Sequence, residues 1–259
     1  MPFPEADRVI YRKNPLVEVV FQARYPKFLP IETELPSEFQ KRLIAKYPLY
    51  EQRNIFQILL AVSPQEGLPP AEMPGRIHAF ISSDRVWTVS LSGDALTVST
   101  VKYVRWEEFR HRMREALEPF LAVYPLPIFT RLGLRYQDLI RPQELGLEQP
   151  WGMLLQPHIA GEFLGPGIER GDIIARTTIL TAKLGNGDMM LLRHGLVSHK
   201  ETQALAYMID SDFYNEEQRT TDLNGTLEVA ERLHVNSGRL FRWCVTEPLH
   251  AAMEPTPVT

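Results

Sequence analysis

The sequence predicts an α+β protein in which antiparallel sheets are each packed by long amphipathic helices. Short segments rich in β-branched and aromatic residues are separated by turn-forming residues, and two longer stretches carry apolar residues at helical spacing. Three expected strands followed by a long helix occur twice along the chain. We therefore expect two similar halves, residues 1–147 and 148–259, which meet in a segment rich in proline and glycine. The halves share too little sequence to establish an internal duplication.

The first half is expected to begin with a strand at residues 16–25, which follows Asn14-Pro15 and alternates apolar side chains onto one face. A short amphipathic helix comes next at 34–47, with Ser37 as its N-cap. The remaining expected elements are strands at 55–62, 76–81, 86–91, 95–101 and 128–140, a proline-rich loop at 63–75, and a long amphipathic helix at 104–124.

The second half repeats this order of elements. Asn186-Gly187, between its first two strands, is a strong hairpin signal. The last helix is expected to run from Leu223 or Thr226 to His250, with Thr226 able to cap its start and Pro248 ending or kinking it. The expected strands are 172–184, 188–197 and 203–213. The apolar face of the helix, which predicts packing on a sheet, includes Leu233, Leu240, Phe241 and Cys244.

The composition is typical of a soluble globular protein, with 259 residues, 44% of them hydrophobic and 23% charged, and a formal charge of −4. This charge argues against nucleic acid or an anionic membrane as the main partner. Because Cys244 is the single cysteine, an intramolecular disulfide and a multi-cysteine zinc site are excluded. The sequence has neither the pattern of a signal peptide nor an apolar run of membrane-spanning length, so we expect a cytoplasmic protein.

Three motifs give the chain a resemblance to a known family. They are Asn14-Pro15-Leu16-Val17-Glu18-Val19-Val20-Phe21, Tyr103 with Trp106-Glu107-Glu108-Phe109, and Leu132-Gly133-Leu134-Arg135-Tyr136. With them the chain resembles, over nearly its whole length, a sporadically distributed family of uncharacterised bacterial proteins of similar length. In that family an aliphatic residue and Asn usually follow the Arg-Tyr pair, whereas Gln137 and Asp138 stand in those places here. The resemblance implies a cytosolic bacterial protein of the kind often encoded in mobile or defence-associated loci, and it carries over no catalytic residue.

The catalytic and cofactor motifs that we tested do not fit the sequence. The seven histidines include no His-Glu-x-x-His, and the closest pair, His194 and His199, would lie on opposite faces of a strand. The glycines of residues 165–171 have the wrong spacing for a dinucleotide-binding loop, and no Gly-x-Ser-x-Gly occurs. Cys244 is expected to be a small buried hydrophobe. We therefore expect no cofactor and no bound metal.

Asp210 and Asp212 are the weak candidates for a metal site. They begin like a calcium loop, but the glycine and the glutamate that such a loop requires are missing. The two-residue period of a strand puts both carboxylates on one face, where they are either a divalent-metal pair or part of a solvated strand end. The arginines and glutamates spaced four apart on the helix at 104–124 indicate ion pairs on a solvated face rather than a nucleic-acid contact.

The strand at 128–140 carries most of the candidate binding residues. Arg131 and Arg135 share one face of this apolar strand, and a half-buried arginine needs a carboxylate, for which Glu18 is the expected partner. The arrangement predicts either a structural ion pair or a site for an anionic ligand. The candidate binding residues are Glu18, Arg131, Arg135, Tyr136 and Asp138.

Because every catalytic template fails, the sequence favours a non-enzymatic protein that binds a partner protein or a second copy of itself. Two alternatives stay open. One is a metal-dependent phosphoester hydrolase that uses Asp210 and Asp212. The other is a small-molecule binder with a cavity between sheet and helix, where Arg135 would meet an anionic ligand.

Overall fold

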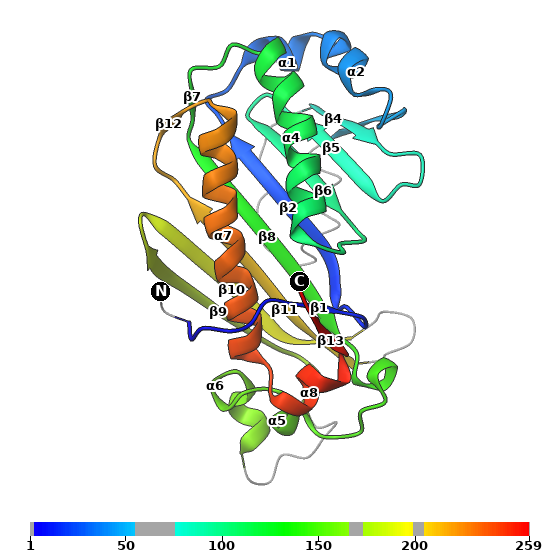
Figure 1. Ribbon diagram of the computed structural model, residues 1–259, viewed down its shortest axis with the longest axis vertical. Helices are drawn as coiled ribbons and strands as arrows, with labels where there is room; N and C mark the ends of the chain where they lie inside the picture. Colours follow the sequence, from blue (N-terminus) through cyan, green and yellow to red (C-terminus); the bar gives the residue numbers. More distant parts are fainter. Residues whose placement is uncertain (1–2, 55–75, 166–172, 199–204, 259) are drawn as a thin grey trace.

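The computed structural model describes residues 3–54, 76–165, 173–198 and 205–258. The strand expected at 55–62, the loop at 63–75, His199 and most of the glycine segment 165–171 lie outside these residues. Within them the protein is a mixed α/β structure with one large antiparallel sheet, as Figure 1 shows.

The described residues form a nine-stranded sheet in which every neighbouring pair is antiparallel. In spatial order the strands are β3 (Leu49–Asn54), β4 (Arg76–Ile81), β5 (Trp87–Leu91), β6 (Ala95–Thr100), β2 (Leu16–Arg24), β8 (Arg131–Ile140), β11 (Leu205–Asn215), β10 (Asp188–Ser198) and β9 (Arg176–Gly185). The strands that we expected in separate sheets therefore lie in one sheet, because β2 pairs with β8. Both strands turn apolar side chains to the same face, where Phe21 lies opposite Leu134.

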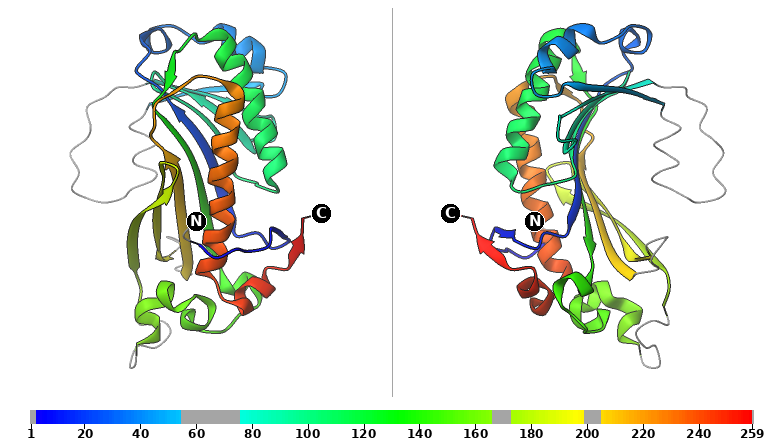
Figure 2. Two further views of the ribbon diagram at one scale, coloured as in Figure 1. Left: turned by 60° about the vertical axis from the view of Figure 1, so that its left-hand side comes forward. Right: turned by 90° about the vertical axis from the view of Figure 1, so that its right-hand side faces the viewer.

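Two long helices, α4 (Trp106–Val123) and α7 (Leu223–Cys244), lie on one face of this sheet (Figures 1 and 2). Their apolar stripes face the strands, and Phe109 and Leu233 are fully buried there. The expected packing of long amphipathic helices on an antiparallel sheet is confirmed.

Shorter elements lie at the two ends of the sheet (Figure 1). At one end are α1 (Leu29–Thr33), α2 (Ser37–Leu43) and the two-stranded pairing of β7 (Ile128–Phe129) with β12 (Arg219–Thr220). At the other are η1 (Pro142–Leu145), α5 (Trp151–Leu154), α6 (Pro157–Ala160), η2 (Gly161–Leu164) and α8 (Glu247–Ala252). The sequence analysis missed α1 and β3.

The two ends of the chain meet on the helix side of the sheet. Strand β1 (Val9–Tyr11) pairs with β13 (Pro255–Pro257) and with no strand of the large sheet. The N-terminal segment therefore passes across α7 on its outer side, as Figure 2 shows. This crossing encloses the space between the segment, α7 and the sheet.

The last helix begins and ends at residues other than those predicted. Asp222 is its N-cap, and its carboxylate accepts a hydrogen bond from the amide of Gly225. Thr226 lies inside the first turn, where its hydroxyl donates to the carbonyl of Asp222. The helix stops at Cys244, and Pro248 stands in the first turn of the separate helix α8, a position that proline favours. Phe241, expected to be buried, is half-buried.

The predicted hairpin between β9 and β10 is confirmed. Asn186 and Gly187 have φ values of 53° and 73°, the left-handed conformation that both central positions of this tight turn require. Among the described residues, no helix combines the length and the apolar character needed to cross a membrane.

Candidate functional site

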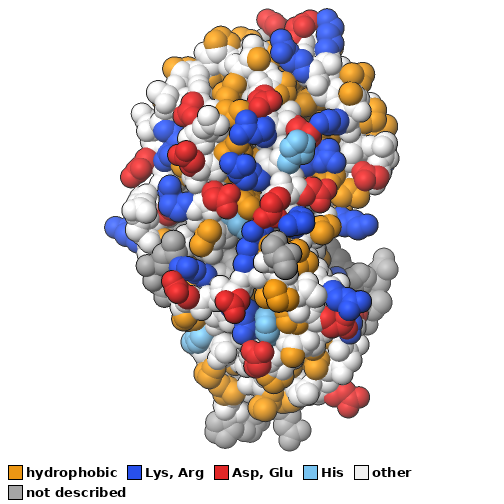
Figure 3. Space-filling view, viewed as in Figure 1, with side chains coloured by type: hydrophobic (Ala, Val, Ile, Leu, Met, Phe, Trp, Pro, Cys, Tyr) orange, Lys and Arg blue, Asp and Glu red, His pale blue; other side chains and the backbone are white. Residues whose placement is uncertain are grey.

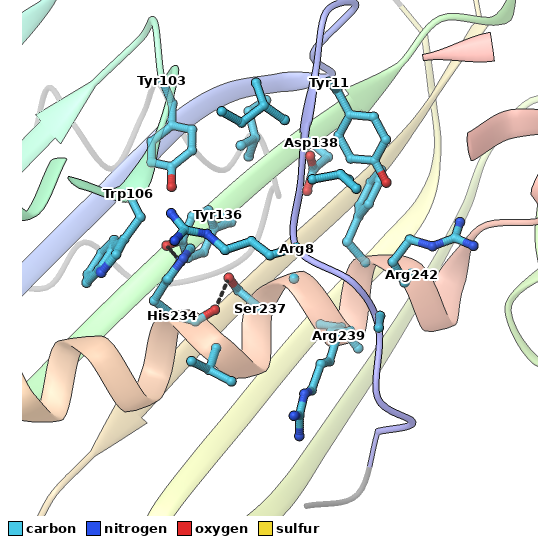
Figure 4. Close-up of a pocket in the computed structure, with 18 of the residues that line it drawn as sticks. Arg8, Tyr11, Tyr103, Trp106, Tyr136, Asp138, His234, Ser237, Arg239 and Arg242 are labelled. Carbon is cyan, nitrogen blue, oxygen red and sulfur yellow. Dashed lines mark hydrogen bonds between the residues drawn. The ribbon is translucent and has the colours of Figure 1, made fainter. Parts of the chain in front are cut away.

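A cavity of about 310 Å³ lies between the N-terminal segment, helix α7 and the large sheet (Figure 4). Its walls come from residues 6–11, the start of α4, strands β8 and β11, and one face of α7. About half of the lining residues are aromatic or aliphatic, and most of the others are charged or polar, among them Arg8, Asp138 and His234. This combination is common in proteins that bind small organic molecules.

An aromatic cluster forms one wall of the cavity. The hydroxyl of Tyr136 lies 2.8 Å from Nδ1 of His234, and the ring of Tyr136 packs edge-on against that of Tyr103, with centroids 5.9 Å apart. The imidazole of His234 stacks on the indole of Trp106, with ring centroids 4.3 Å apart and planes 8° apart. Trp106 in turn donates from Nε1 to a carboxylate oxygen of Glu231, at 2.6 Å. Three elements, β8, α4 and α7, are fixed to one another through this cluster.

The burial of these groups keeps them uncharged. Burial lowers the pKa of His234 to about 3, so the imidazole is neutral at physiological pH. Burial also raises the pKa of Tyr136 well above its usual value. His234 and Tyr136 therefore offer hydrogen-bonding groups and aromatic surface to the cavity without carrying a charge.

Asp138 is a buried acidic group of the cavity, and it has no partner among the described residues. Its side chain is on the same face of β8 as Tyr136 and points toward Tyr11 of the N-terminal segment (Figure 4). The residue is 6% exposed, and within the described residues its carboxylate makes no hydrogen bond and no ion pair. Burial, and to a smaller extent the charge of Asp210, raise the pKa of Asp138 to about 8.

Two other buried aspartates show how this protein normally holds a carboxylate. Arg135 binds Asp210 through two hydrogen bonds, of 2.6 and 2.9 Å, and Arg232 binds Asp188 through two of the same lengths. Both are the bidentate pairs that make a buried carboxylate tolerable. Asp138 is as buried as these two and has no such arginine, which marks it as a group whose partner is absent from the described chain.

The arginines that line the cavity bind other acids. Arg8 pairs with Glu107 at 2.7 Å, and Arg242 pairs with Glu247 at 3.0 Å. In Figure 4 the guanidinium of Arg8 points toward Tyr136 and Tyr103, away from Asp138. Within the described residues, neither arginine forms a hydrogen bond or an ion pair with the carboxylate of Asp138.

The N-terminal segment is held over the cavity by its own contacts. The hydroxyl of Tyr11 lies 2.8 Å from Nδ1 of His250 in α8, and its ring packs edge-on against Phe241 at 5.6 Å. Pairing with β13 and the ion pair of Arg8 with Glu107 hold the segment on either side of this point. Side chains of both charges surround it on the helix-bearing face of the molecule, which Figure 3 shows.

The predicted binding residues fall on two faces of the sheet. Tyr136 and Asp138 line the cavity, whereas Glu18, Arg131 and Arg135 lie on the opposite face because side chains alternate along a strand. Of the five predicted binding residues, only Tyr136 and Asp138 therefore line the cavity.

On that opposite face the predicted ion pair of Arg135 exists with a different partner. Asp210 binds Arg135 directly, and Asp212 binds Arg131 at 2.7 Å. Glu18, the expected partner, acts on Arg135 only as a more distant charge. Strand β11 pairs with β8 from Tyr207 to Asn215 and places both aspartates beside the arginines, which the sequence order could not indicate.

These ion pairs also give arginine partners to Asp210 and Asp212, the weak metal candidates of the sequence. Each carboxylate is already neutralised by an arginine, and a metal ion would have to displace that arginine. In the part of the chain that the structure describes, no three histidine, cysteine or acidic side chains gather in a way that could hold a metal ion. The residues around the cavity suit an organic molecule instead.

Sequence reasoning missed several residues of the cavity. Tyr103 and Trp106 were noticed only as motif residues, and His234, Tyr11 and Gly238 were not singled out. Gly238 offered a signal, because a glycine inside a helix costs stability and needs a reason. A Cβ atom added there would meet no described atom within 4 Å, so the glycine leaves open space beside the cavity.

Comparison with known proteins adds no assignment: no family model, no curated protein and no solved structure matches this chain. The family resemblance of the three motifs therefore stays a prediction.

Proposed function

We propose that this protein binds a small organic molecule in the cavity beneath its N-terminal segment. The observation that carries the proposal is Asp138, a buried carboxylate without a partner in the described chain, which lines the cavity beside aromatic and aliphatic side chains. An unpaired buried acid costs stability, and such groups are retained where they serve a site. The polar groups around it orient a ligand, and the aromatic walls exclude water from it.

Gly238 gives a way to test the proposal without disturbing the fold. A tryptophan at this position has room for its Cβ and would project into the mouth of the cavity, while replacing a helical glycine removes a cost of about 1 kcal/mol. Gly238→Ala is the matched control, because it makes the same helix more stable and leaves the mouth open.

The experiment compares small molecules bound to the two variants and to the wild-type protein. Each protein is purified from its expression host under native conditions and extracted, and the extract is examined by mass spectrometry. N-phenyl-1-naphthylamine, a neutral apolar fluorophore, is also titrated into each protein. We expect wild type and Gly238→Ala to bind the fluorophore and retain the same co-purified molecule, and Gly238→Trp to do neither. Equal binding by Gly238→Trp, with an unchanged melting temperature, would contradict the proposal.

A second proposal concerns the partner protein that the sequence favoured. Strand β9 is at the edge of the large sheet, and its Ile179 and Leu180 are 64% and 41% exposed. An exposed edge with apolar side chains supports pairing with a strand of another protein or of a second copy. Ile179→Lys is expected to abolish such pairing in sedimentation or pull-down experiments, whereas Lys183→Ala on the same strand is expected to leave it unchanged. We also propose that the protein is cytoplasmic and that it belongs to the bacterial family whose motifs it resembles.

We also propose that the chain consists of two similar halves. The support is the order of elements: β2, a connection, the meander β4 to β6 and α4 are followed by β8, a connection, the meander β9 to β11 and α7. The first strand of each set pairs with the last strand of its own meander, and the two first strands pair with each other. This arrangement favours a boundary in the α4–β7 connection rather than at residues 147 and 148.

A further inference from the structure

We propose that the ligand of the cavity is a small organic cation, a protonated amine on an apolar body, and that its nitrogen pairs with the carboxylate of Asp138. The inference rests on the proposed function and narrows it to one class of ligand. Its basis is the contrast between Asp138 and the paired aspartates of the same protein.

The protein supplies a cation to its other buried aspartates but not to Asp138. Asp188 and Asp210 each receive a bidentate arginine, and the arginines beside the cavity are engaged by Glu107 and Glu247. A ligand that brings its own ammonium group completes the same kind of pair at Asp138. The gain is large because the carboxylate is already removed from water before the ligand arrives.

The surroundings of Asp138 suit a cation with an apolar body. Tyr11 and Phe241 pack edge-on beside it, and Tyr103 and Tyr136 form a second edge-on pair at 5.9 Å. Aromatic faces attract organic cations, and the aliphatic residues of the lining bury the remainder of such a molecule. A carboxylate-bearing ligand would instead be repelled by Asp138 whenever that group is ionised.

Binding of an amine would release a proton from the protein. The titratable or charged groups around Asp138 are Tyr11 of the N-terminal segment, Arg242 and Cys244 of α7, and Asp210 of β11. Of these, only Asp210 adds to burial in raising the pKa of Asp138. Since the pKa of Asp138 is raised to about 8 in the folded protein, the carboxyl is protonated at pH 6 and must ionise to pair with an ammonium group. The affinity for an amine is therefore expected to rise about tenfold from pH 6 to pH 7 and about fivefold from pH 7 to pH 8, where about half of the carboxyl groups are already ionised.

The test uses three probes that share one ring system and differ in charge: 1-naphthylmethylamine, 1-naphthalenemethanol and 1-naphthoic acid. Their affinities are measured calorimetrically at pH 6, 7 and 8, in two buffers of different ionisation enthalpy, for wild type, Asp138→Asn and Gly238→Trp. Asp138→Asn keeps the shape of the side chain and removes its ability to ionise. Circular dichroism establishes that each variant is folded.

At pH 8 we expect wild type to bind the amine at least about tenfold more tightly than the alcohol, a preference that Asp138→Asn loses while its affinity for the alcohol stays the same. Proton release should accompany amine binding to wild type at pH 6 and be absent in Asp138→Asn. Suppose that wild type binds the alcohol more tightly than the amine and that Gly238→Trp does not bind the alcohol. The proposal of a cationic ligand would then be wrong, and the cavity would remain a ligand site. If none of the probes distinguishes wild type from Gly238→Trp, both the cation and the proposed ligand site are overturned.

Discussion

The buried aspartates Asp138, Asp188 and Asp210 differ in what faces them. Asp188 and Asp210 each receive two hydrogen bonds from one arginine, and Asp138 faces aromatic rings. A bidentate arginine makes a buried carboxylate tolerable, whereas an unpaired buried carboxylate is held at a cost in stability. Substitutions at these residues therefore have opposite effects on stability.

Replacing Arg135 with methionine is expected to reduce the free energy of unfolding by about 3–5 kcal/mol, because it leaves Asp210 buried without its bidentate partner. Urea unfolding at neutral pH measures the change. Arg193→Met is the matched control: Arg193 reaches the same carboxylate at 3.7 Å, but its side chain is 44% exposed. Its loss should cost less than about 1 kcal/mol. Equal effects of the two substitutions would show that Asp210 does not depend on Arg135.

Asp138 should make the wild-type protein less stable as the pH rises. The pKa of this carboxyl is 3.8 in its ordinary state and about 8 in the folded protein, so the folded form binds the proton more tightly. Its contribution to stability is fully present below pH 4 and is lost between pH 4 and pH 8, by at most about 1.4 kcal/mol per pH unit. Wild type and Asp138→Asn are compared by urea unfolding at pH 5, 6, 7 and 8. We expect Asp138→Asn to gain stability relative to wild type at each step, and parallel curves would contradict a raised pKa.

Among the elements, helix α7 contributes most to the cavity and to the packing of the sheet. It carries His234, Ser237, Gly238 and Arg242 on the side that faces the cavity, and Leu227, Leu233 and Leu240 in the core. Because α7 carries both cavity residues and core residues, the residue at which the helix begins fixes the position of the cavity residues.

The start of α7 depends on Asp222. Its carboxylate accepts a hydrogen bond of 2.6 Å from the amide of Gly225, and it lies at the end of the helix where a negative charge is stabilising. Asp222→Ala should therefore cost about 1 kcal/mol in thermal or urea unfolding. Asp222→Asn keeps the acceptor and should cost less. If alanine were tolerated as well as asparagine, the cap would have to come from another group.

The whole molecule is held together by the pairing of β2 with β8. This pairing joins the strands of the first meander to those of the second, and α4 and α7 pack against each other on the same face. In the described sheet, hydrogen bonds run continuously from the first set of strands to the second. The protein is therefore expected to unfold as one cooperative unit.

Hydrogen–deuterium exchange at increasing urea concentrations checks this expectation. Peptides from β5 and from β10, which lie on either side of the β2–β8 pair, should lose protection at the same midpoint. Peptides from β2 and β8 themselves serve as the reference. If β10 exchanged at a lower urea concentration than β5, the second meander would open as a separate unit.

Local features of the molecule followed from the sequence. The meander at residues 76–101, the two long helices and the Asn186-Gly187 hairpin depend on spacing and turn chemistry within a few neighbouring residues. For the same reason, the alternation of β8 could indicate that Arg131 and Arg135 share a face and need carboxylates.

The tertiary structure alone decided which carboxylates pair with Arg131 and Arg135, and where the cavity lies. Asp210 and Asp212 reach the arginines because β11 pairs with β8 across more than sixty intervening residues, a choice that depends on how all nine strands are ordered. The cavity exists because the N-terminal segment pairs with the C-terminal strand and crosses α7, which brings Tyr11 over Asp138. Sequence patterns report the environment within one element, whereas a site is made by side chains from several. Tyr136 and Asp138 were therefore recognisable as candidates, but the cavity that they line together with the N-terminal segment and α7 was not.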